Sequence, residues 1–146
     1  MTTEFEASSL VIDAMQLVAQ QEIVVALDLL NTSEIPTAAL RHAALSVMAV
    51  VMSGVGASAR FAELRQATHD VALLHGAQDR QAVLNLETIA AAQAFEQGDS
   101  GRADAIIAGS VFTPIDHAWC AVALTGQAGH GWLGDHAAAT WPRQRR

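Results

Sequence analysis

The stretch 36–56, PTAALRHAALSVMAVVMSGVG, decides the fold class of this chain. Proline suits the first turn of a helix, Ser46 is the one polar side chain among residues 43–52, and two glycines then end the run. About ten apolar residues are too few to cross a bilayer and are typical of a buried core helix. We therefore expect a core helix over residues 36–53 and no membrane-spanning segment.

Alanine dominates the composition and favours helix over strand along the whole chain. It has the highest helix propensity and occurs thirty times, whereas strands prefer β-branched and aromatic residues and the chain has no tyrosine. Capping residues, glycines and three prolines divide the apolar periodic stretches into five or six segments. We predict an all-α fold, a compact bundle of five or six helices with short connections.

Local signals set the limits of these helices. Asp79 is placed to cap one helix, and Thr113 with Asp116 forms the capping box of another. The glycines from Gly126 onward predict an irregular C-terminal part. The predicted helices cover residues 8–30, 36–53, 58–75, 79–97, 102–108 and a segment that begins at 113.

The first predicted helix carries an apolar stripe at three-four spacing. The stripe consists of Val11, Met15, Val18, Val25 and Leu29. Its second part, residues 22–30 (EIVVALDLL), contains a β-branched pair and could form a short strand instead. Because no other segment offers a partner strand, one unbroken helix is favoured, and the strand stays an open alternative.

Length and apolar content predict one domain that self-associates. A chain of 146 residues fits a single helical domain over 1–146, with 1–7 and 142–146 as flexible ends. Its residues are 51% apolar and 16% charged, a larger apolar share than soluble domains usually have. A second copy often covers such surplus surface. We expect a homodimer that packs through apolar faces of the first two helices. The alternative partner is another cytoplasmic protein.

The charge balance argues against nucleic acid as a partner. The net charge is −7, and the eight positive side chains are all arginines, three of them within the last four residues. No helix face can therefore offer the basic stripe that phosphate binding requires. The single cysteine cannot form an internal disulfide, and the first residues, MTTEFE, lack the basic and apolar regions of a secretory signal. We expect a cytoplasmic protein that binds neither nucleic acid nor membranes.

The stretch DHAWC, residues 116–120, contains the single cysteine of the chain and offers a candidate site. His117 and Cys120 lie one turn apart on a helix, and His130 with His136 could complete a zinc site of three imidazoles and one thiolate. This spacing matches no familiar zinc module, and free cysteine is usually buried like a small apolar residue. We therefore expect no metal and favour core packing of Cys120, with a site as the alternative.

A catalytic role for Cys120 is weak for a geometric reason. A nucleophilic cysteine needs a base, which normally approaches from another element, whereas His117 stands on the same rigid helix. Two carboxylates, Glu22 and Glu87, fall on otherwise apolar helix faces. A carboxylate that meets a histidine inside the bundle would form a polar site, whereas one at the edge of its face would stay in water.

These observations predict a non-enzymatic interaction module that self-associates through apolar helix faces. The alternative is a helical bundle that binds a small molecule or a metal ion between its helices, with His117, Cys120 and Glu87 as contacts. The sequence has no P-loop, no dinucleotide fingerprint and no paired-cysteine module, so we expect no cofactor. An enzyme is the least favoured class, because no residue set combines reactive chemistry with a spacing that requires it.

Overall fold

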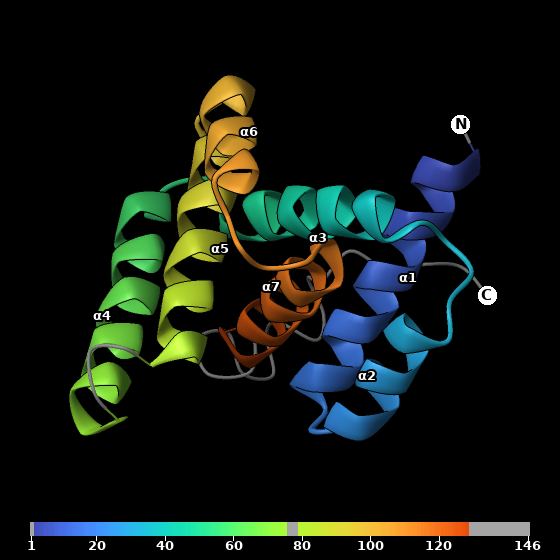
Figure 1. Ribbon diagram of the computed structural model, residues 1–146, viewed down its shortest axis with the longest axis horizontal. Helices are drawn as coiled ribbons and strands as arrows, with labels where there is room; N and C mark the ends of the chain where they lie inside the picture. Colours follow the sequence, from blue (N-terminus) through green and yellow to red (C-terminus); the bar gives the residue numbers. More distant parts are fainter. Residues whose placement is uncertain (1, 76–78, 129–146) are drawn as a thin grey trace.

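The chain folds into α-helices, as a computed structural model that describes residues 2–75 and 79–128 shows (Figure 1). Over these residues there are seven helices and no strand. The helices are α1 (Thr2–Ala19), α2 (Ile23–Asn31), α3 (Thr37–Met52), α4 (Ala57–His75), α5 (Arg80–Glu96), α6 (Ser100–Ala108) and α7 (Pro114–Ala128). The all-α prediction is confirmed, but the number of helices is seven rather than five or six.

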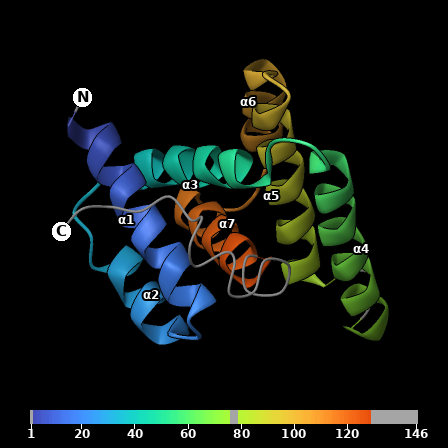
Figure 2. The same ribbon diagram turned by 180° about the vertical axis from the view of Figure 1, so that it is seen from behind.

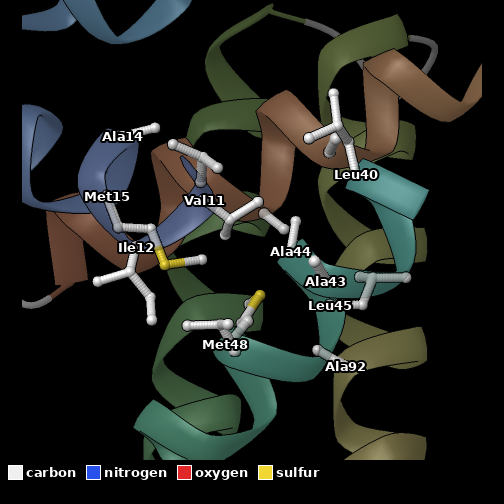
Figure 3. Packing of buried hydrophobic residues seen from close by; sticks show 14 of the residues in the cluster. Val11, Ile12, Ala14, Met15, Leu40, Ala43, Ala44, Leu45, Met48 and Ala92 are labelled. Carbon is white, nitrogen blue, oxygen red and sulfur yellow. The ribbon is translucent and has the colours of Figure 1, made fainter. Parts of the chain in front are cut away.

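Helix α3 is central to the packing. It packs most extensively on α7, and it also packs on α1 and α5. Helices α1 and α2 lie near one end of α3, and α4 and α5 lie near the other end (Figures 1 and 2). Val11 and Met15 of α1 lie near Ala44 and Met48 of α3 (Figure 3), and all four are fully buried. The apolar run of the sequence is therefore a core helix, as predicted.

The predicted single helix over residues 8–30 is wrong, because the chain turns at Gln21. The backbone of Gln21 has φ 69°, a left-handed conformation that is uncommon without glycine. The amide of Glu22 donates to the carbonyl of Leu17 and that of Gln21 to Val18, which is the hydrogen-bond pattern of a Schellman motif. Residues 23–31 form a second helix that folds back on α1, so the strand alternative is excluded.

The helix limits follow the predicted caps with small shifts. The Asp79 carboxylate accepts a hydrogen bond from the Gln81 amide at 3.2 Å. The capping box at the start of α7 is complete, since Thr113 and Asp116 exchange bonds of 3.1 and 3.3 Å. Helix α1 begins at Thr2 rather than at 8, so the expected flexible N-terminal end is helical from its second residue; residues 142–146 lie outside the described residues.

Gly126 lies inside α7 and is buried, which corrects the predicted irregular segment. A Cβ atom added to it would lie 2.6 Å from the Cβ of Val18 and 2.8 Å from the carbonyl oxygen of Met15. Glycine therefore allows α7 and α1 to pack with their backbones close together. The glycines predicted to follow it, from 129 onward, lie outside the described part of the chain.

Helix α5 buries a broader surface than its periodicity predicts. Val83 is 42% exposed, whereas Leu84, Thr88 and Ile89 are buried. The reason is that α5 packs against α3, α4, α6 and α7, so it has no single buried stripe. Over the described residues, no single helix is long and apolar enough to cross a membrane, and α3 with α4 would be so only as a pair bent by 118°.

Candidate functional site

A partly buried polar cluster forms where α5, the connection between α6 and α7, and the start of α7 meet. Glu87 comes from α5, Ser110 from the connection and His117 from α7. The Glu87 carboxylate oxygen Oε1 accepts a hydrogen bond of 2.5 Å from the Ser110 hydroxyl and lies 3.1 Å from His117 Nε2. Ser110 Oγ is 3.4 Å from the same nitrogen. The cluster therefore joins three elements through one carboxylate oxygen.

Local structure holds Ser110 and His117 in place. The Ser110 hydroxyl oxygen accepts a bond of 3.0 Å from the amide of Phe112, which closes the turn before α7. The capping box then fixes the first turn of α7, and His117 follows Asp116 directly. The Phe112 ring packs edge-on against His117, with 6.2 Å between ring centroids, and the Arg80 guanidinium lies 4.6 Å above the Phe112 ring.

Burial and hydrogen bonding define the surroundings of the His117 ring. Its side chain is 2% exposed, whereas that of Glu87 is 24% exposed, so the carboxylate keeps contact with water. Because Nε2 faces a carboxylate acceptor, we assign the ring proton to Nε2. Nδ1 has no hydrogen-bond partner among the described residues and is buried.

The cluster does not have the geometry of a serine nucleophile with a histidine base. In such a triad the histidine takes the serine proton through one nitrogen and the carboxylate orients the other nitrogen. Here both Ser110 and Glu87 lie against Nε2, and the Ser110 hydroxyl donates to Glu87. The serine proton is thus directed away from the histidine, and the arrangement is suited to joining elements.

Cys120 lies on the same helix but bonds elsewhere. It is 2% exposed, and its Sγ donates to Asn85 Oδ1 at 3.1 Å. Burial, and to a smaller extent the negative charge of Asp116, raises the pKa of Cys120 from 9.0 to about 12, while a hydrogen bond with Thr88 lowers it. At neutral pH the sulfur is therefore a thiol, which is a poor nucleophile and a poor metal ligand.

The structure brings together two of the three candidate contacts. Glu87 and His117 form a pair, whereas Cys120 forms its hydrogen bond with Asn85. Within residues 2–75 and 79–128 no three His, Cys, Asp or Glu side chains are grouped to hold a metal ion. His130 and His136, which the zinc hypothesis requires, lie outside the described residues. The use of His117, Cys120 and Glu87 as a ligand site stays a prediction.

Two further residues complete the comparison with the sequence: Glu22, which was predicted, and Ser110, which was not. Glu22 lies in the turn before α2 and is exposed, so it needs no partner. Ser110 was not predicted, although it contacts both members of the Glu87–His117 pair. Its one local signal is the position just before the Phe112 turn, and serine is common in turns for many reasons.

Over the described residues the chain is a helical protein with a partly buried carboxylate–hydroxyl–imidazole cluster. The chain matches no known family, and comparisons with curated proteins and with solved structures find no match either. Function is therefore argued from the geometry of the chain itself.

The cluster should contribute measurably to stability. In Ser110→Ala, Glu87 and the Phe112 amide lose a hydrogen-bond partner, so we expect the free energy of unfolding to fall by about 2 kcal/mol. Urea denaturation followed by circular dichroism measures this change. Ser58→Ala is the control, because Ser58 is exposed on α4, and its change should stay within about 0.5 kcal/mol. Equal stability of the two variants would show that the cluster does not join the elements.

Proposed function

We propose that this protein is a non-enzymatic helical module that self-associates through the outer face of α2. The observation that carries the proposal is the burial of this helix. Its nine residues, IVVALDLLN, are apolar at seven positions, yet only Ala26 and Leu30 are buried. Val24 is 72% exposed and Val25 is 50% exposed. A helix that is apolar at most of its positions is normally covered over most of its surface.

The position of α2 supports the contact. It packs mainly on α1 and lies at one end of the molecule, away from α4 (Figures 1 and 2). A second copy can therefore reach its outer face without contacting the rest of the fold. A two-fold contact would pair the same valines from each copy, as symmetric dimers do. Full burial of a fully exposed valine contributes about 1.5–3 kcal/mol, so Val25, which is 50% exposed, contributes about half as much.

The acidic side chains near this face oppose the contact between two copies. Glu22 and Asp28 are exposed on and beside α2, and both are negative. In a two-fold contact each copy brings the same acids, so their repulsion weakens association at low ionic strength. Added salt screens this repulsion and should tighten the dimer.

The exposed leucines of α4 make a weaker interface. Leu73 and Leu74 are each 84% exposed and Val71 is 50% exposed, but Gln66, His69 and Asp70 are exposed on the same helix. Apolar side chains interrupted by polar ones are ordinary on a protein surface. The polar cluster also supports a non-catalytic role, because its serine donates to Glu87 rather than to the histidine.

Sedimentation velocity over a range of protein concentrations tests the proposal. At micromolar concentration we expect the apparent mass of the wild type to be twice the 15.4 kDa of one chain. The double variant Val24→Glu/Val25→Glu places two charges in the contact, so the dissociation constant should rise by about 100-fold or more. Circular dichroism should remain that of a folded helical protein.

The control is Leu73→Glu, which adds one such charge at an exposed apolar position on α4, away from α2. It should dimerise like the wild type. A wild type that stays monomeric at about 100 µM, far above the dissociation constants of stable dimers, would contradict the proposal. So would a Leu73→Glu variant that dissociates as readily as the α2 variant.

A further inference from the structure

We infer that a pocket between α4, α5 and α7 binds a small organic cation with an apolar body. The pocket lies on the α4 side of α3, away from α2, and the inference does not depend on self-association. It also uses residues other than the Glu87–Ser110–His117 cluster. Three observations carry it: the apolar wall, the charge of the rim and the Asn85 amide, one of several polar groups in the lining.

The wall of the pocket is mainly apolar. Its volume is about 320 Å³, within the range of small-molecule sites. The apolar side chains in the lining come from all three helices, and they include Leu64, Ala67, Val71, Ala82 and Leu124. Leu64 and Ala82 are buried, whereas Val71 is 50% exposed. A ligand with an aromatic or branched body would remove this half-exposed surface from water.

The charged groups in the described lining are both acidic. Glu63 comes from α4 and Asp79 from the residue that precedes α5, and no arginine belongs to this part of the lining. One oxygen of Asp79 accepts the bond from the Gln81 amide, which leaves the other oxygen for a ligand. The whole chain has a net charge of −7, which adds to the local negative potential. A cation is therefore attracted to this pocket, and a carboxylate of the same shape is repelled.

Asn85 supplies a hydrogen-bond donor in the lining. Its oxygen accepts from Cys120 Sγ at 3.1 Å and from Gln81 Nε2 at 2.8 Å, and these two bonds fix the orientation of the amide. The NH2 group has no partner among the described residues. The pocket can thus hold a ligand that carries an acceptor or an aromatic face toward Asn85 and an ammonium group toward the rim.

Isothermal titration calorimetry with tryptamine and indole-3-acetate tests the inference, because the two probes share a ring and carry opposite charges. Tryptamine should bind with an affinity at least about tenfold higher than indole-3-acetate. Glu63→Gln should weaken tryptamine binding by about threefold to tenfold. Added salt should also weaken it.

Two tryptophan variants locate the site. Ala67→Trp fills the pocket and should abolish tryptamine binding, whereas Ala59→Trp, at another exposed alanine of α4 outside the lining, should retain it. The Val24→Glu/Val25→Glu variant should bind tryptamine like the wild type, so this result is separable from dimerisation. No binding of tryptamine, equal binding of the two probes, or equal binding by both tryptophan variants would overturn the inference.

Discussion

Gly126→Ala is expected to lower the free energy of unfolding by about 3 kcal/mol, although alanine is the better helix former. The added Cβ would lie 2.6 Å from the Cβ of Val18 and 2.8 Å from the carbonyl oxygen of Met15. Met15 contributes a backbone atom, which cannot move aside as the end of a side chain can. Helices α1 and α7 would therefore have to separate, and the buried contacts on both sides of the crossing would loosen.

Gly101→Ala is the matched control, since Gly101 also lies in a helix. The nearest atom to its added Cβ is Asp99 Oδ1 at 3.9 Å, an ordinary contact distance. This variant should be neutral or gain up to about 1 kcal/mol from helix propensity. Urea denaturation of both variants measures the difference. If Gly126→Ala were as stable as Gly101→Ala, α1 and α7 would not pack as closely as the structure shows.

Local signals predicted the starts of α5 and α7 and the core helix α3. The Asp79 cap and the Thr113–Asp116 box depend on residues two or three positions apart, so the sequence contains both partners together. The run in α3 is apolar on most sides, which predicts burial whatever the neighbours are. These features could be predicted because they depend little on tertiary packing.

Features that depend on packing could not be predicted in this way. Gln21 ends α1 in a left-handed conformation that glycine usually provides, as Gly98 does after α5. Gly126 resembles a helix breaker in sequence, but its place is decided by how closely α1 approaches. Neither residue type reveals its outcome, because glutamine is uncommon at a positive φ and because the contacts that decide the place of Gly126 come from another helix.

The candidate site shows the same division. Glu87 was singled out because a carboxylate on an apolar face needs a partner, and that partner could be a histidine. His117 lies thirty residues further along the chain, so only the folding of α7 against α5 identifies it. The predicted His117–Cys120 pairing depended on helical spacing, but Cys120 bonds to Asn85 on α5 instead. His117 and Cys120 therefore lie one turn apart on α7 but bond to different residues of α5.

Stability should fall between about pH 9 and pH 12 because of one thiol. Burial raises the pKa of Cys120 from 9.0 to about 12, so the unfolded chain loses this proton before the folded one does. The full stabilisation is present below pH 9 and is lost as the pH rises toward 12. The slope should be about 1.4 kcal/mol per pH unit, and the total loss about 4 kcal/mol.

No other side-chain type of this chain ionises in that interval, which makes the measurement specific. The chain has no lysine and no tyrosine, and arginine keeps its proton above pH 12. Urea denaturation at several pH values should show the slope in the wild type and no slope in Cys120→Ala, whatever stability that variant loses at neutral pH. Identical slopes would mean that the thiol of Cys120 ionises as easily in the folded chain as in the unfolded one. That result would contradict its burial between α5 and α7 and, with it, the hydrogen bond that orients Asn85 toward the pocket.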